Sequence, residues 1–217
     1  LFGITGILTT IWYTAFFSGL SFLRGPMRVD ESVVEWMLLI AGTISMSFYV
    51  VVGKWSDRVG RKKPIIIGAI ASLVLLFPVF WAIGSLANPG LERSARAAPV
   101  TVSGPACEYD PFAEVQASPC GRALQDLTAL GIPYTIDDAA AAQLAIGSRI
   151  YGYEDLPDDT RRASIQSWLE TNGYDFTRQT PPLASLVGIV ALLLLLGVLS
   201  ALTYGSVAAL LSEMFPA

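Results

Sequence analysis

The chain of 217 residues is 53% hydrophobic and only 15% charged, and its formal net charge is −4. In soluble proteins about a quarter of the residues are charged. A chain without excess positive charge offers no basic surface to phosphates. The composition therefore excludes a soluble enzyme, a disordered chain and a nucleic-acid-binding protein, and it favours a multi-span membrane protein with a polar insertion.

Charge is missing from four long stretches, each about as long as a membrane span. A helix needs about 20 apolar residues to cross the hydrocarbon core of a bilayer. We therefore expect an all-α polytopic membrane protein, a helical bundle with four spans, carrying a small α+β insertion before the last span. The uncharged stretches are residues 1–23, 36–53, 64–91 and 179–212, and the expected spans are Phe2–Leu23, Val33–Gly53, Pro64–Leu86 and Leu183–Leu211.

The spans divide the chain into three parts: residues 1–86 with three spans, the insertion 87–182, and residues 183–217 with the fourth span and the start of another loop. Lys and Arg accumulate in short cytoplasmic loops. The connection 54–63 holds five of them, whereas 24–32 holds two. We therefore expect 54–63 to be cytoplasmic and the insertion to be extracytoplasmic, in the plasma membrane of a bacterium.

The first span carries an aromatic face. Thr9, Tyr13, Phe16 and Phe17 recur at helical spacing and so lie on one side of the predicted helix. Thr9, Tyr13 and Phe17, with Tyr204 of the fourth span, are candidates for a substrate cavity. The alternatives are helix packing for the first-span residues and an aromatic at the membrane interface for Tyr204.

Glu35 is an acidic residue at the start of the second span. Intramembrane acids are usually functional, which makes a proton carrier one reading. However, Ser32 and Glu35 have the spacing of a capping box at a helix start, and we favour that interpretation.

The insertion contains both cysteines, Cys107 and Cys120. In an oxidising compartment we expect a disulfide between them, worth about 3 kcal/mol in the chain-entropy model; two free thiols are the alternative. The chain has no His, and two cysteines with twelve residues between them are poor metal ligands. We therefore expect no metal and no cofactor, and no nucleophile–base pair suggests an enzyme.

Turn and cap residues indicate that the insertion is folded. Ser118 and Pro119 are typical of a helix start, and Gly131 of a helix end. Further along, the pattern predicts short strands at Ile132–Ile136 and Arg149–Tyr153, a brief Ala-rich helix from Asp137 to Gly147, and a helix from Asp159 to Asn172.

The connection between the second and third spans has an unusual composition. It reads Gly53-Lys54-Trp55-Ser56-Asp57-Arg58-Val59-Gly60-Arg61-Lys62-Lys63, with one acid among five bases. Glycines permit a tight turn, and the charged groups can meet helix termini. A plain positive loop is the alternative, but such a loop needs neither Asp57 nor two glycines.

This connection resembles the G-x-x-x-D-[RK]-x-G-R-[RK]-[RK] loop of the major facilitator superfamily. The end of the fourth span, from Tyr204-Gly205 through Ala208-Ala209 to Glu213 and Phe215-Pro216, is similar to the tenth helix of its metabolite:proton symporter branch. Trp55 departs from the smaller aliphatic residue common in that loop. The likeness in motifs covers two short stretches, and the likeness in span layout covers the chain.

The resemblance implies helices seven to ten of a twelve-helix carrier, so we expect the chain to be a piece of a longer protein. The partners implied are a small-molecule substrate, protons, the lipid bilayer and the missing N-terminal six-helix half. Alternating access would move the two halves about a midplane site. The residues that would latch one conformation are Gly53, Asp57, Arg58, Gly60, Arg61, Lys62 and Glu213.

The sequence thus predicts a secondary active transporter, a proton-coupled symporter for a small charged metabolite such as an organic acid or a zwitterion. Two other classes stay open. One is a transporter-like sensor that binds a solute without moving it, and the other is a membrane-anchored extracytoplasmic binding module.

Overall fold

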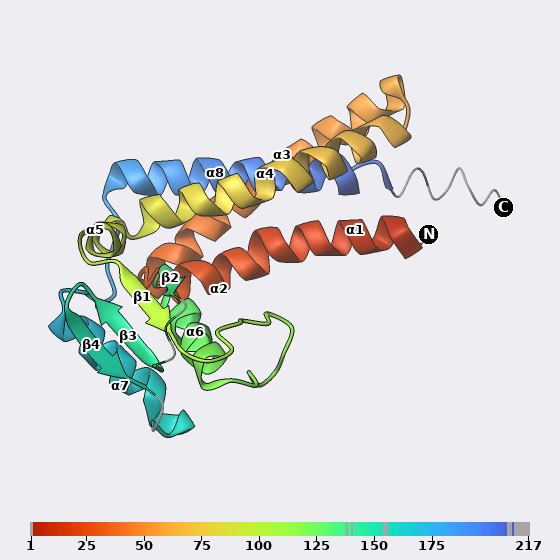
Figure 1. Ribbon diagram of the computed structural model, residues 1–217. Helices are drawn as coiled ribbons and strands as arrows, with labels where there is room; N and C mark the ends of the chain where they lie inside the picture. The colour runs from red at the N-terminus through yellow and green to blue at the C-terminus, as the bar shows by residue number, and fades with distance from the viewer. Residues whose placement is uncertain (1, 138, 140, 154–155, 208–209, 211–217) are drawn as a thin grey trace. The chain divides into compact units, whose positions relative to one another are not determined.

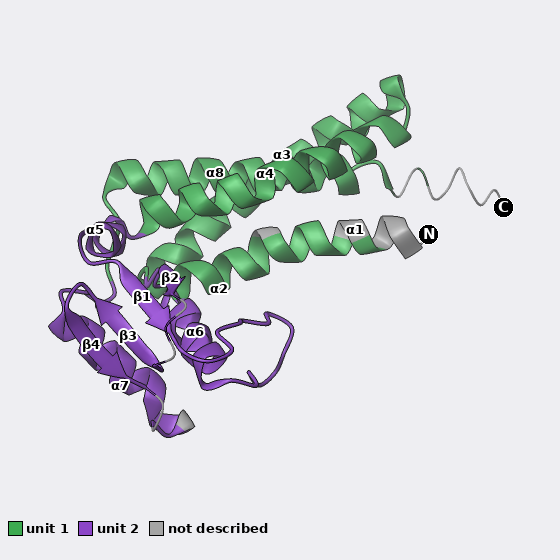
Figure 2. Ribbon diagram, in the orientation of Figure 1, with its two compact units in different colours: residues 1–24, 29–87, 179–217 green, residues 25–28, 88–178 purple. Residues whose placement is uncertain are grey.

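Figure 1 shows a computed structural model of the chain, which describes residues 2–137, 139, 141–153, 156–207 and 210. The chain divides into two compact units (Figure 2). Unit 1 is helical and comprises residues 1–24, 29–87 and 179–217, whereas unit 2 contains a β-sheet and comprises residues 25–28 and 88–178.

Three long helices dominate unit 1: α3 (Glu31–Val59), α4 (Lys62–Ala87) and α8 (Leu183–Tyr204). α8 packs against both α3 and α4. Among the described helices, these three are long and apolar enough to cross a membrane. Large apolar side chains of α4 remain exposed in the unit, including Leu73 at 78% and Phe77 at 83%. An apolar outer surface of this kind suits lipid better than water.

The first part of unit 1 differs from the expected span Phe2–Leu23. It is divided into α1 (Phe2–Tyr13), the π-helix η1 (Thr14–Ser18) and α2 (Gly19–Arg24). None of these three pieces is a candidate span. A π-helix joins each N–H to the carbonyl five residues earlier, and the uncharged composition of a segment does not reveal such a change.

The predicted fold class, an all-α bundle with four spans, is wrong. The chain is mixed α/β, because the strands of unit 2 join into a four-stranded sheet. Three rather than four of the described helices qualify as spans. The prediction failed because it took every uncharged stretch as one continuous α-helix and counted the sheet as a minor addition.

The sheet of unit 2 has the strand order β2-β1-β3-β4 (Figure 1). β1 pairs with β2 in parallel, while the pairs β1–β3 and β3–β4 are antiparallel. The strands are β1 (Val100–Ser103), β2 (Tyr134–Asp137), β3 (Gln143–Ile146) and β4 (Arg149–Gly152), and the helices of the unit are α5 (Pro89–Ala97), α6 (Pro119–Leu130) and α7 (Asp158–Thr171).

One face of the sheet forms the core of unit 2 together with α6 and α7. Val102 of β1 lies opposite Leu144 of β3, and residues paired across strands share a face. Both are fully buried, as are Leu124 of α6 and Ile165 and Leu169 of α7. Burying such a side chain contributes about 1.5–3 kcal/mol, so this cluster accounts for much of the stability of the unit.

Two strand predictions match the sheet, and one helix prediction is wrong. The segments expected at Ile132–Ile136 and Arg149–Tyr153 correspond to β2 and β4. The Ala-rich helix expected from Asp137 to Gly147 does not exist in its described part, because Gln143–Ile146 is β3. β3 pairs with β1 on one side and β4 on the other, and such long-range pairing overrides local helix propensity.

The predicted ends of α6 are confirmed. The Ser118 hydroxyl accepts a hydrogen bond from the Gly121 N–H at 2.9 Å, as an N-cap does. At the other end Gly131 adopts φ +72°, a left-handed conformation that favours glycine. Cys107 and Cys120 form a disulfide with a Cα–Cα distance of 4.9 Å, which ties the segment before α6 to its first turn.

Tyr174 should make the stability of unit 2 fall at alkaline pH. Its hydroxyl donates to the Ala98 carbonyl at 2.7 Å, and burial raises the pKa of Tyr174 from 10.0 to about 12. The unfolded chain releases this proton first, so the free energy of unfolding should drop by about 2 kcal/mol between pH ~10 and pH ~12.

Tyr174→Phe should remove this part of the pH dependence. The melting temperature of unit 2 in the detergent-solubilised chain, followed from about pH 9 to about pH 12, measures it. An alkaline loss as large in Tyr174→Phe as in the parent would contradict the assignment.

Candidate functional site

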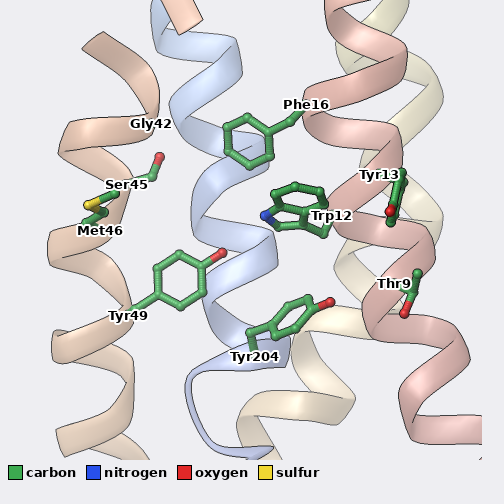
Figure 3. Close-up of a pocket in the computed structure, with 9 residues that line it drawn as sticks. All are labelled: Thr9, Trp12, Tyr13, Phe16, Gly42, Ser45, Met46, Tyr49 and Tyr204. Carbon is green, nitrogen blue, oxygen red and sulfur yellow. The ribbon is translucent and has the colours of Figure 1, made fainter. Parts of the chain in front are cut away.

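Unit 1 contains a cavity of ≈650 Å³ between α1, η1, α3 and the end of α8 (Figure 3). Sites for small molecules have volumes of about 300–1,000 Å³. α1 and η1 supply one wall and α3 supplies another. The lining residues are Thr9, Trp12, Tyr13, Phe16, Gly42, Ser45, Met46, Tyr49 and Tyr204.

The structure brings three of the four predicted cavity residues together. Thr9, Tyr13 and Tyr204 line the cavity. Phe17 lies outside the lining, although its ring centroid is 5.4 Å from that of Tyr13. Phe17 belongs to η1, and a π-helix does not keep the angular spacing of 3.6 residues per turn on which the prediction rested.

The predicted cavity residues did not include those of α3, which form a second wall. Gly42, Ser45 and Tyr49 follow one another at spacings of three and four residues, so they share one helix face. That spacing, with a tyrosine and a serine in an apolar helix, was the available signal. Trp12 was also missed; its ring lies 5.3 Å from that of Tyr13 and 5.9 Å from that of Phe16, centroid to centroid.

The polar groups of the cavity are uncharged. The Tyr49 hydroxyl and the Ser200 hydroxyl are hydrogen-bonded at 2.9 Å, which fixes the Tyr49 ring. Ser45 is 2% exposed, and its hydroxyl has no hydrogen-bond partner among the described residues. This hydroxyl faces Gly197 of α8, where a built Cβ would overlap it, so close packing of α3 against α8 encloses it.

The connection between α3 and α4 is shorter than the predicted loop 54–63. α3 continues to Val59 and α4 begins at Lys62, so Gly60 and Arg61 alone connect the two helices. Gly60 adopts φ +95°, a conformation that is strained for other residues. A tight turn at this glycine thus sets the directions of both helices.

The motif residues of this turn are linked by side-chain interactions. Asp57 and Arg61 form an ion pair across one helical turn. Arg61 Nη1 also donates to Ser56 Oγ at 3.0 Å, and Ser56 Oγ donates to the Gly53 carbonyl at 2.7 Å. The Gly60 N–H donates to the Ser56 carbonyl at 3.0 Å. Together these hydrogen bonds provide donors for the carbonyl groups of Gly53 and Ser56 at the end of α3. They also place the cation of Arg61 where the helix dipole favours it.

The remaining predicted motif residues are Arg58, Lys62, Gly53 and Glu213. Arg58 and Lys62 are exposed. A Cβ built on Gly53 would lie 3.5 Å from the Gly205 carbonyl, so α3 and the end of α8 are close neighbours there. Glu213 lies outside the described residues.

Glu35 does not form the predicted capping box. α3 begins at Glu31 with Asp30 as its N-cap residue, two residues before Ser32. Instead Glu35 Oε1 accepts a hydrogen bond from Arg24 Nη2 at 2.6 Å. The carboxylate is largely exposed. Because the helix starts before Ser32, Glu35 does not stand three residues after an N-cap, as a capping box requires.

In the part of the chain that the structure describes, no group of three or more His, Cys, Asp or Glu residues could hold a metal ion.

Comparisons with protein-family models, with curated proteins and with solved structures find no match for this chain. The resemblance to the major facilitator superfamily therefore rests on the residues of the α3–α4 turn and of the end of the fourth predicted span alone.

Proposed function

We propose that this chain is part of a secondary active transporter of the major facilitator type, a proton-coupled symporter that moves a small metabolite by alternating access. The missing first half would supply the other wall of the solute pathway and the proton-coupling group. The plasma membrane of a bacterium is the proposed location, with unit 2 on the extracytoplasmic side. The single observation that carries the proposal is the cavity in unit 1.

The chemistry of the cavity favours a solute with a cationic group. Five aromatic side chains line it, and its described lining contains no Lys or Arg that could pair with a carboxylate. Aromatic faces attract cations by about 0.5–2 kcal/mol. Within the proposed class of small charged metabolites, these features support a zwitterion over an organic acid.

Trp12→Ala should lower solute uptake about tenfold, because a lost cation–π contact of about 1.4 kcal/mol corresponds to that factor. The matched control is Trp36→Ala, since Trp36 lies on α3, is 65% exposed and does not line the cavity. Initial uptake rates are measured with the full protein in proteoliposomes under an imposed pH gradient, using labelled zwitterionic amines and organic acids.

The outcomes distinguish the proposed carrier from its rivals. Accumulation driven by the pH gradient and lowered by Trp12→Ala alone would support the carrier. Binding without flux would identify a sensor instead. Binding that is insensitive to Trp12→Ala would place the ligand outside the cavity, and would favour a module that works through unit 2.

Asp57→Asn should lower uptake about fivefold while leaving membrane insertion intact. The substitution removes the charge that pairs with Arg61, and an exposed pair contributes up to about 1 kcal/mol, which corresponds to about that factor in rate. Glu35→Gln is the matched control, because Glu35 is also an exposed carboxylate paired with an arginine near a helix end. Unchanged uptake in Asp57→Asn would remove the latch role.

A further inference from the structure

β4 is an outer strand of the sheet in unit 2, and its main-chain groups alternate in direction. Among the described residues its only sheet neighbour is β3. In an antiparallel pair, residues that exchange both hydrogen bonds alternate with residues that exchange none. The turn Gly147–Ser148 joins the paired residues Ile146 and Arg149. A two-residue hairpin turn of this kind closes on a hydrogen-bonded pair.

The bond from the Tyr153 N–H to the Ala142 carbonyl, at 3.4 Å, continues the same alternation. The N–H and C=O groups of Arg149, Tyr151 and Tyr153 therefore face β3. Those of Ile150 and Gly152 point to the open edge of the sheet. An edge of this kind is a template for another extended strand.

A groove of ≈620 Å³ runs beside this edge, between β4 and α7. Tyr151 and Trp168 both line the groove, and their rings stack with a centroid distance of 5.4 Å. The rest of its lining comes from α7 and has short side chains: Thr160, Ala163, Ser164, Ser167 and Thr171. The groove therefore has room for side chains that project from a strand added to β4.

The two edges of the sheet are protected to different extents. β2, the opposite edge, ends in the exposed carboxylate of Asp137. On β4 the only charged residue is Arg149, which donates to Asn172 Oδ1 at 2.6 Å, next to the end of α7. Beyond it Ile150 is 61% exposed. Natural sheets usually place charges or prolines on edges that must stay unpaired. The two residues of β4 whose main-chain groups face the open edge, Ile150 and Gly152, are neither charged nor proline.

We propose that β4 pairs with β4 of a second copy of this chain, antiparallel and about a two-fold axis at Tyr151. The outward-facing residues then pair with each other, so Ile150 lies opposite Gly152 of the partner subunit in both directions. A large side chain thus meets a residue that has none. Tyr151 lies opposite Tyr151 of the partner subunit on the groove side, which extends the stack of Tyr151 and Trp168 across the axis.

Charge complementarity favours a second copy over an unrelated strand. β4 starts beside the C-terminal end of α7, where Arg149 bonds to Asn172. Five residues separate the end of β4 from the start of α7, and Asp159 is exposed in the first turn of α7. Antiparallel pairing therefore brings the Arg149 cation of each copy toward the acidic first turn of α7 in the other copy.

Ile150→Lys tests the edge, because a lysine there repels an added strand. Ile136→Lys is the matched control, since Ile136 is a 49% exposed isoleucine on the opposite edge. Sedimentation of the full chain in density-matched detergent should show a reversible dimer. Ile150→Lys should lower the dimer fraction at least about fivefold at equal concentration, and Ile136→Lys should leave it unchanged.

Cysteine cross-linking tests the register independently. A Cβ at Gly152 meets nothing within 4 Å, so Gly152→Cys is tolerated. A mixture of Ile150→Cys and Gly152→Cys chains should cross-link more than either variant alone. A chain that stays monomeric at every concentration, equal effects of the two lysine variants, or no preference for the mixed cross-link would each overturn the proposal. Unchanged melting of Ile150→Lys verifies that unit 2 remains folded.

Discussion

Asp126→Ala is expected to destabilise unit 2 by about 3–5 kcal/mol, the range found when one partner of a buried ion pair is removed. Asp126 lies on α6 with 5% of its side chain exposed. It accepts from Arg161 Nε at 2.7 Å and from Arg162 Nε at 3.0 Å, both on α7. Arg161 is itself 8% exposed, so the variant leaves a buried guanidinium group without this carboxylate.

Arg162→Ala is the matched control for this prediction. The side chain of Arg162 is 55% exposed, and solvent-exposed pairs contribute at most about 1 kcal/mol. Trp168 is the one of the five tryptophans that lies in unit 2. Near-ultraviolet circular dichroism of the detergent-solubilised chain, with the spectrum of a Trp168→Phe variant subtracted, therefore follows the unfolding of this unit. A loss below about 1 kcal/mol in Asp126→Ala would mean that the pair does not hold α6 and α7 together.

Gly197→Val should disrupt the packing of α8 against α3. A Cβ on Gly197 would overlap the Ser45 hydroxyl and lie 2.8 Å from Ser45 Cβ. Helices in membranes approach through small residues, and side chains forced into a packed contact cost about 1–3 kcal/mol or more. Because Ser45 also lines the cavity, the same variant should abolish solute binding.

Gly42→Val is the matched control for stability, since a Cβ on Gly42 meets nothing within 4 Å. The melting temperature of the detergent-solubilised protein should fall in Gly197→Val and stay unchanged in Gly42→Val. Equal melting of the two variants would show that α3 and α8 do not approach at this position.

The elements set by local chemistry were predictable from the sequence. The uncharged run from Pro64 to Leu86 corresponds to α4, because an apolar stretch of more than about 20 residues is typical of a helix long enough to cross a bilayer. The ends of α6 followed from Ser118 and Gly131, whose side chain and backbone freedom, respectively, suit those positions.

The elements set by distant partners were not predictable. β1 has four residues and no distinctive pattern, yet it lies in the middle of the sheet. β3 was expected to be helical, but hydrogen bonds to strands on both sides determine its conformation. The π-helix η1 (Thr14–Ser18) has no distinctive residue pattern, because its composition is that of the apolar helices on either side.

Only part of the candidate cavity could be predicted from the sequence, because the rest depends on how distant helices pack. Thr9, Tyr13 and Tyr204 stood out as polar or aromatic residues within apolar spans. Ser45 and Tyr49 gained their role from the position of α8, whose Ser200 bonds to Tyr49. The role of a helix face can be inferred only when the helix that packs against it is known.

The proposed transporter requires that α4 cross the membrane, with the α3–α4 turn and unit 2 on opposite sides. Single-cysteine variants test this directly, because both native cysteines are in the disulfide. Lys62→Cys lies at the start of α4, and Ala97→Cys lies at the end of α5 in unit 2; both positions are exposed. With a membrane-impermeant maleimide, we expect intact cells to label Ala97→Cys only, and permeabilised cells to label both. Equal labelling of the two variants in intact cells would contradict the transporter account.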